Sequence, residues 1–211
     1  MIPNSLDEII LLIIEPTKEA SKELKKISNE QNYEFLKNEI LNKYSRKIES
    51  KISSFKSHKL HIDDISLELI LDDLVSYCRT RINVKCSNEE INRKYRVGEL
   101  SSYLYLNELE NRLGFIIIEN RFYELYEQAY DKHGKVKDPE AEKMFKIYSK
   151  LLKKTSKFPS LREILYRKIG QLYIRDLYER GILKETPEGY IILTDHPKVQ
   201  EVMKKFYRYI K

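Results

Sequence analysis

The sequence is poor in residues on which many enzyme folds depend: its 211 positions include six glycines, two cysteines and no tryptophan. Nucleotide-binding folds place glycines where the backbone must approach a phosphate closely. None of the six glycines lies in a GxGxxG or GxxxxGK[ST] motif. The sequence therefore excludes an enzyme built on either kind of phosphate-binding loop.

The two cysteines, Cys78 and Cys86, are eight residues apart and form none of the CxxC pairs that metal and redox sites use. We expect two core thiols in a reducing compartment. The N-terminus lacks the basic segment of a secretory signal, and the apolar run from Ile9 to Ile14 is too short to cross a bilayer. The sequence therefore predicts a cytoplasmic protein that does not bind a membrane.

Residues that could carry catalysis or bind a metal are scattered. The histidines form no HxxxH, HExxH or His-Cys grouping; they are His58, His61, His133 and His196. Two acidic pairs, at 63–64 and 72–73, could hold Mg²⁺ on one helix face, but no lysine or histidine completes such a site. Acids at a helix start explain the first pair more simply. We therefore predict a protein that is not an enzyme and needs no cofactor or metal.

Charge is abundant and unevenly distributed. Charged residues make up 34% of the chain, and the formal net charge is +6. Positions 141–211 carry 17 Lys and Arg against 8 Asp and Glu, a net charge of +9, which leaves −3 for positions 1–140. Six lysines in this last third recur at three- and four-residue steps: Lys143, Lys146, Lys150, Lys153, Lys154 and Lys157. On a helix they would form a cationic face, which is either a solvated surface or a contact for a polyanion.

The first 60 residues are predicted to be helical. Ser5 and Glu8 form a capping box ahead of the apolar run, which Pro16 is expected to interrupt before a second helix over about 17–28. A third helix, about 31–56, carries an apolar stripe; its members are Phe35, Leu36, Ile40, Leu41, Tyr44, Ile48, Ile52 and Phe55. The stripe predicts either core packing or a homodimer formed through these helices.

The rest of the chain contains an internal repeat. Residues 87–100 and 160–172 both read S-x-x-E-I, then basic residues, then V/I-G-[E/Q]-L, and each begins with a capping box. Each copy continues into a predicted helix that ends at a glycine, Gly114 or Gly181. Helices over about 62–78 and 138–156 are expected to precede the two copies.

Each copy is predicted to end in a two-stranded hairpin. In the first copy the strands are 115–118 and 121–125, and in the second they are 182–185 and 190–194. The second copy leaves one alternative open. Either a short reading helix fits between Gly170 and Gly181, or one helix runs from Ser160 through Gly170 to Arg180.

This order of capped helices, Gly-ended helix and hairpin resembles the winged helix-turn-helix superfamily, over about residues 62–196. The resemblance implies a mainly α fold with small β-hairpins (α+β). A helical region over 1–60 would precede one winged-helix domain at 61–130 and a second at 138–211 with a basic tail.

Winged helices bind duplex DNA through a reading helix and a wing, so the resemblance implies a DNA-binding protein. The expected role is in transcription regulation or as a replication or segregation accessory. In the second copy the expected contacts to double-stranded DNA are Arg162, Arg167, Lys168, Gln171, Tyr173, Arg175 and Lys184, together with Lys150, Lys153, Lys154 and Lys157. The first copy offers Arg93, Lys94 and Arg96 beside several acids, so we expect a weaker DNA contact or a protein-docking surface there. The alternative is a scaffold subunit that does not read DNA, because the fold alone does not decide function.

Overall fold

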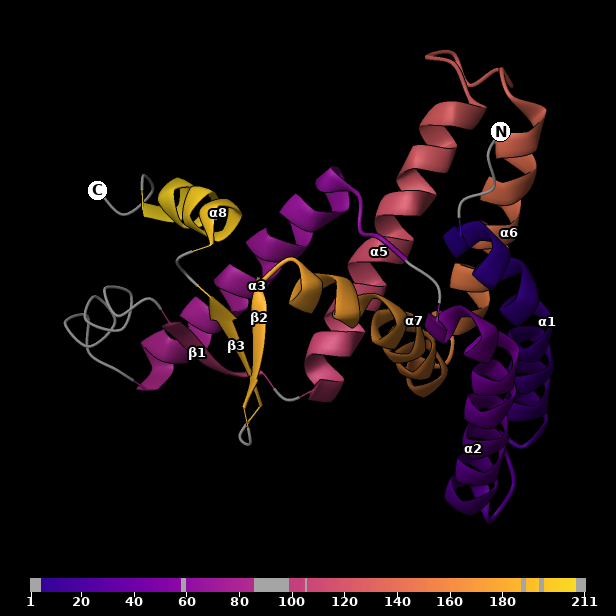
Figure 1. Cartoon of the computed structure of the whole chain (residues 1–211). Helices are drawn as coiled ribbons and strands as arrows, with labels where there is room; N and C mark the ends of the chain where they lie inside the picture. Colours follow the sequence, from indigo (N-terminus) through magenta and orange to yellow (C-terminus); the bar gives the residue numbers. More distant parts are fainter. Residues whose placement is uncertain are drawn as a thin grey trace. The chain divides into compact units, whose positions relative to one another are not determined.

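The chain is mainly helical in the computed structural model, which describes residues 5–57, 60–85, 99–104, 106–186, 189–193 and 196–207 (Figure 1). The elements in chain order are α1 (Ser5–Lys26), α2 (Tyr33–Ile52), the 3₁₀ helix η1 (Ser53–Ser57), α3 (Asp64–Lys85), β1 (Glu99–Leu104), α5 (Leu106–Ala129), α6 (Pro139–Thr155), α7 (Pro159–Glu179), β2 (Leu183–Thr186), β3 (Gly189–Leu193) and α8 (Pro197–Tyr207).

The chain forms two compact units, and neither is a continuous stretch of sequence. Unit 1 combines Met1–Leu60 with Ile118–Lys168, and unit 2 combines His61–Ile117 with Ile169–Lys211. The divisions fall inside α5 and α7. This arrangement differs from the consecutive segments, 61–130 and 138–211, that the repeat predicts.

In unit 1, α1 packs against both α2 and α6. The prediction that Pro16 interrupts the first helix is wrong, because α1 continues through Pro16 to Lys26. A proline inside a helix leaves the carbonyl four residues earlier without its N–H donor. That carbonyl belongs to Leu12, a residue that is 40% exposed, so water can reach this part of the helix.

The apolar stripe of α2 is largely used inside unit 1. Tyr44, Ile48 and Ile52 are buried, and the Tyr44 hydroxyl lies 3.0 Å from that of Thr17 on α1. Burial raises the pKa of this tyrosine well above its usual range. Two cross-helix ion pairs, Lys43–Glu23 at 2.9 Å and Lys47–Glu19 at 2.5 Å, hold the exposed edge. The C-terminal half of the stripe therefore packs within the chain, whereas Phe35 at its start is 67% exposed, and homodimerisation stays a prediction.

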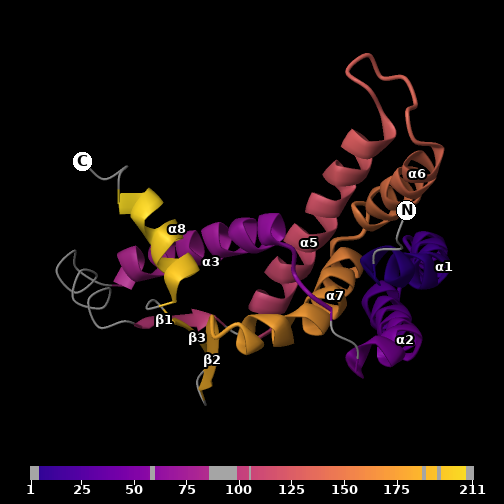
Figure 2. The ribbon, with the colours of Figure 1, turned by 45° about the horizontal axis from the view of Figure 1, so that its top comes forward.

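Unit 2 places a small sheet among helices. The strands lie in the order β1-β3-β2, and β3 pairs antiparallel with both neighbours. Helix α3 packs against β1 and α8, and α8 lies beside α3 in Figures 1 and 2. Asp63 caps α3, since its Oδ1 accepts from the Ser66 N–H at 2.8 Å.

Two glycines of unit 2 have distinct roles. Gly181 has a φ of 70° and follows α7; its N–H donates to the Tyr178 carbonyl while the Ile182 N–H donates to the Leu177 carbonyl. This pattern is a Schellman motif, so the prediction that a helix ends at this glycine is confirmed. Gly170 lies inside α7, where a Cβ would come 1.8 Å from the Glu110 carbonyl oxygen on α5. Only glycine allows the two helices to approach this closely.

The tandem winged-helix prediction of the fold class, mainly α with small β-hairpins, is wrong. The first predicted hairpin, at 115–125, is part of the continuous helix α5, and Gly114 lies inside that helix instead of ending it. Buried residues recur there every four positions, which is a helical period: Leu113, Ile117, Arg121, Leu125 and Ala129. The short apolar run 115–118 was ambiguous, because periodicity over four residues cannot separate a buried strand from a buried helix.

The second copy also departs from the winged-helix order. Of the two alternatives there, the structure takes the single helix, because α7 runs unbroken from Pro159 to Glu179. Strands β2 and β3 do form an antiparallel hairpin, but its β3 pairs with β1 as well, so it is part of a three-stranded sheet. Over the described residues the two copies therefore differ: α5 continues through the positions where a hairpin is predicted in the first copy, whereas the second copy does form one.

Candidate nucleic-acid interface

Several residues of the expected reading helix are used inside the fold. The Lys168 side chain is 12% exposed and its Nζ lies 3.4 Å from a carboxylate oxygen of Glu49. The Gln171 amide donates to Oε2 of Glu110 at 3.0 Å, and Tyr173 is buried. Arg167 is half-buried. Gln171 itself is exposed, so only Lys168 and Tyr173 are largely withdrawn from solvent, and the DNA contacts of these side chains stay a prediction.

The exposed members of the expected site lie in different units. Arg162 is in unit 1, whereas Arg175 and Lys184 are in unit 2. Arg175 also pairs with Glu179 at 2.6 Å. Three further expected contacts lie outside the described residues: Arg93, Lys94 and Arg96.

The lysines of α6, by contrast, share one face. The helix begins at Pro139 because Asp138 caps it, accepting from the N–H groups of Glu140 at 2.9 Å and Ala141 at 3.1 Å. Its core side is formed by Ala141, Tyr148, Leu151 and Thr155. At about 100° per residue, five lysines fall on the opposite side within an arc of roughly 100°. We call this surface the lysine face; it consists of Lys143, Lys146, Lys150, Lys153 and Lys154, and the exposed Lys157 follows in the next turn.

The lysine face has little internal neutralisation. Lys146 pairs with Glu142 at 2.7 Å, but no other lysine of the face has an ion pair among the described residues. Unit 1 contains 24 Lys and Arg against 17 Asp and Glu, a net charge of +7, whereas unit 2 contains 15 against 16, a net charge of −1. The basic charge therefore belongs to unit 1 rather than to the last third of the sequence as such.

Five aromatic rings form a connected cluster where α5 meets α6. Phe145 of α6 stacks on Phe122 at 4.8 Å between centroids and also contacts Tyr126 at 5.5 Å and Tyr130 at 5.7 Å. Phe122 contacts Tyr123 edge-on at 5.7 Å. Tyr123 is 63% exposed and Tyr126 is 50% exposed. Two tyrosines thus remain accessible although the phenylalanines behind them are packed.

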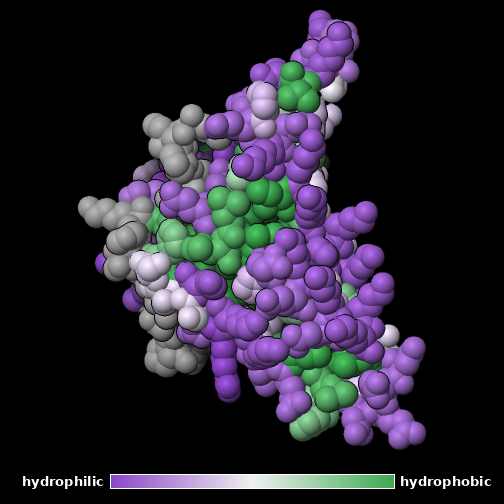
Figure 3. All heavy atoms as spheres, turned by 90° about the vertical axis from the view of Figure 1, so that its right-hand side faces the viewer, coloured by the Kyte–Doolittle hydropathy of each residue, from purple (hydrophilic) through white to green (hydrophobic). Residues whose placement is uncertain are grey.

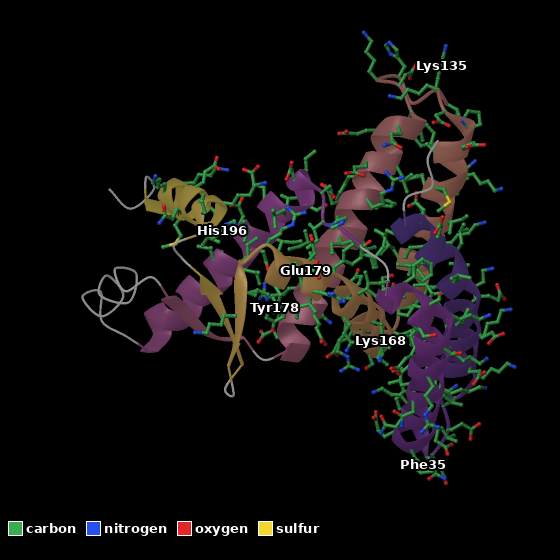
Figure 4. All side chains as sticks on the ribbon, viewed as in Figure 1. Phe35, Lys135, Lys168, Tyr178, Glu179 and His196 are labelled. Carbon is green, nitrogen blue, oxygen red and sulfur yellow. The ribbon has the colours of Figure 1, made fainter. Side chains whose placement is uncertain are left out.

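One carboxylate joins the aromatic cluster to the lysine face. Glu142 accepts a hydrogen bond from the Tyr130 hydroxyl at 3.3 Å and pairs with Lys146. Desolvation and this neighbouring carboxylate raise the pKa of Tyr130. The loop from α5 to α6 adds three exposed lysines, Lys132, Lys135 and Lys137, and Figure 4 labels the second of them.

A buried polar network holds α5 and α6 against α1. Arg121 donates to Asp7 through Nε at 3.1 Å and through Nη2 at 2.7 Å, and its Nη1 reaches Glu124 at 3.0 Å. The Tyr148 hydroxyl donates to the same Asp7 at 2.9 Å. Burial alone would lower the pKa of Arg121, but the Asp7 contact outweighs it and raises the pKa. The network fixes the two helices that carry the lysine face and the exposed tyrosines.

Sequence reasoning missed the aromatic cluster because residues 121–125 were assigned to a strand. The signal was present, since Phe122, Tyr126 and Tyr130 recur every four residues and would share one face of a helix. Reading 115–130 as a helix would have placed these rings together.

The acidic pairs that were weighed as Mg²⁺ ligands have other partners. Asp63 caps α3, Asp64 pairs with Lys198 at 2.8 Å, and both Asp73 carboxylate oxygens accept from Arg112 at 2.8 Å. Each contact stabilises α3 within unit 2.

Two leucines of α1 are exposed on unit 1, Leu11 at 48% and Leu12 at 40%. Figure 3, viewed from the side on which α1 and α6 lie in Figure 1, shows an exposed hydrophobic area among hydrophilic side chains. An apolar area of this kind is typical of a contact with another protein.

Comparisons with family models, with curated proteins and with solved structures found no match to this chain. Within the described part of the chain, no helix combines the length and the apolar character needed to cross a bilayer.

Proposed function

We propose that this protein binds DNA through the lysine face of unit 1, and that the phosphate backbone supplies most of the contacts. The observation that supports the proposal is a set of five lysines on one side of α6, of which all but Lys146 lack acidic partners among the described residues. The contacts of the predicted winged-helix reading helix form no part of it. A role beside DNA in transcription, replication or segregation, in the cytoplasm, is part of the same proposal.

The length of the lysine face on α6 matches the spacing of phosphates along a DNA backbone. Lys143 and Lys154 are eleven residues apart, which is about 16 Å along a helix. Duplex DNA carries one negative charge per about 1.7 Å of its axis, so each lysine of the face would lie within reach of a phosphate. Lysine acts as a point charge with a flexible stem, so it contacts phosphates without reading base edges. The proposal therefore describes binding with little sequence preference.

A scaffold role is the second candidate, and the exposed Leu11 and Leu12 favour it. The two candidates differ in salt dependence. Phosphate contacts release counterions and weaken steeply with salt, whereas an apolar contact does not.

The experiment that tests the proposal is a titration of labelled mixed-sequence DNA with the full chain at two salt concentrations. The triple variant K150E/K153E/K157E should weaken binding at least about tenfold and reduce the salt slope, because it replaces phosphate contacts by repulsion. The matched control is K22E/K25E/K26E, which changes the net charge equally on exposed positions of α1.

An equal loss of DNA affinity in both triple variants would mean that only net charge matters for binding, and it would contradict an interface on α6. Absence of binding at low salt would overturn the proposal. The scaffold role would be favoured instead if the protein kept a fixed protein partner at both salt concentrations and the variant L11E/L12E lost that partner.

A further inference from the structure

We infer that the nucleic acid bound by unit 1 is single-stranded, with unpaired bases stacking on the exposed Tyr123 and Tyr126 of α5. This inference rests on the proposed function, because the lysine face supplies the affinity for the backbone. The observation that carries it is a pair of accessible aromatic rings adjoining that face in the same unit.

Tyr123 and Tyr126 present two accessible aromatic faces close together, which is an arrangement that a flat aromatic ligand can cover. Tyr123 and Tyr126 are three residues apart, so they lie on neighbouring positions of one helix surface. Phe122 and Phe145 pack behind them and restrict their rotation. A ring held in place loses little conformational entropy when a base stacks on it.

The basic groups that could hold a nucleic-acid backbone lie on α6 and in the loop after α5, while α5 itself contributes the acids Glu119, Glu124 and Glu127 near the rings. The lysine face approaches the cluster through Glu142, which contacts both Lys146 and Tyr130. The loop lysines 132, 135 and 137 follow the last ring of the cluster in sequence. Sites for single strands combine a basic track for the backbone with aromatic rings for the bases.

Duplex DNA would leave these tyrosines unused. Its bases are stacked within the helix and present only their edges in the grooves. A single strand exposes base faces, and each stacked base contributes about 1–3 kcal/mol as measured by alanine substitution. The two tyrosines therefore favour single strands over duplex of the same length.

The test measures the affinity of the full chain for a labelled oligo(dT) and for a mixed-sequence duplex of equal length. The variant Y123A/Y126A should weaken oligo(dT) binding at least about tenfold and duplex binding by less than about twofold. The variant Y123F/Y126F keeps the rings and should bind like the wild type. F35A removes a ring that is 67% exposed on α2, outside the cluster, and serves as the matched control (Figure 4).

A spectroscopic measurement tests stacking directly. The chain has no tryptophan, so Y126W introduces a single indole whose fluorescence can be excited selectively. Oligo(dT) should quench this indole, and it should leave the indole of F35W unchanged. Quenching at both positions or at neither would overturn the stacking contact.

The outcomes separate the inference from the proposed function. If Y123A/Y126A binds both ligands as the wild type does while the lysine variants lose binding, the inference fails and the proposed function stands. Tighter binding to the duplex than to oligo(dT) would also overturn the inference. If neither ligand binds, both fail.

Discussion

The two units use their charges in different ways. In unit 1 the buried guanidinium of Arg121 is neutralised by Asp7 and Glu124, and two lysines of α2 pair with glutamates of α1. Most lysines of α6, by contrast, have no ion pair among the described residues. In unit 2 the basic side chains hold neighbouring helices together: Arg112 pairs with Asp73, and Lys198 and Lys205 of α8 pair with Asp64 and Glu68 of α3.

This difference indicates which charges the fold itself requires. Apart from Lys146, which pairs with Glu142, the lysines of the face have no ion pair among the described residues, so their loss should cost unit 1 little stability. Charges that do not support a fold are the ones available for a ligand. In unit 2 most of the described basic groups are already used within the unit, which is why we place the interface on unit 1.

The largest expected effect is a loss of stability, and it should be larger for a buried ion pair of unit 1 than for a partly exposed ion pair of unit 2. R121A leaves Asp7 buried without its counter-charge and should lower the free energy of unfolding by about 3–5 kcal/mol. R112A removes a partly exposed pair with Asp73 in unit 2 and should cost under about 1 kcal/mol. Urea unfolding measures both.

A paired substitution controls for lost packing. D7L/R121M replaces both charges by apolar groups and should recover much of the stability lost in R121A, although the Tyr148 hydroxyl also loses its acceptor. Equal losses in R121A and R112A would remove the distinction drawn here between the two units.

The second prediction concerns glycines whose constraints differ. G170A in unit 2 forces a Cβ against the Glu110 carbonyl and should cost about 1–3 kcal/mol or more, because backbone atoms must move. G134A in unit 1 meets no neighbour within 4 Å but keeps a φ of 76°, so only backbone strain of about 1 kcal/mol is expected. Thermal unfolding of both variants checks the order, and a larger loss in G134A would contradict the close helix crossing.

The smallest effect is on the pH dependence of stability. Burial raises the pKa of Glu119 above 4.5, and the Tyr166 hydroxyl and the charge of Arg162 only partly offset this. A raised folded-state pKa contributes stability that is present below about pH 4.5 and is lost as pH rises through the folded-state pKa. E119Q should therefore be more stable than the wild type at neutral pH, by under about 1 kcal/mol, with the difference shrinking toward pH 4.

Asp72 of unit 2 provides the comparison. Burial also raises its pKa, the charge of Lys205 lowers it, and the charge of Glu68 raises it. D72N should therefore show an effect of the same sign as E119Q in urea unfolding across the same pH range. An E119Q curve parallel to that of the wild type would show that this carboxylate does not control the pH dependence.

Local signals predicted helices and their ends better than they predicted the fold. The cationic side of α6 and the glycine stop at Gly181 follow from spacing and capping chemistry, which act over a few residues. The low exposure of Lys168 depends on its pairing with Glu49, 119 residues earlier, and Gln171 is held by Glu110, 61 residues earlier. A single sequence carries no local sign of such contacts.

The fold prediction made from the internal repeat was wrong for a related reason. The glycines at 114 and 181 occur in similar sequence contexts, but only the second is followed by a turn in the left-handed conformation. Four-residue spacing of buried side chains through 113–129 outweighs the glycine and keeps α5 helical. Tertiary packing thus decided between helix and strand where local preference was balanced.

The discontinuous chain path of unit 1 also determines the order in which the protein can fold during synthesis. Asp7 of α1 lies 114 residues before Arg121 and 141 residues before Tyr148. Helix α1 therefore leaves the ribosome close to its partner α2 but long before its partners on α5 and α6 exist. Contacts this distant in sequence slow folding, and exposed apolar surface during the delay promotes aggregation. The buried faces of α1 and α2 are therefore the segments that most need a chaperone on the nascent chain.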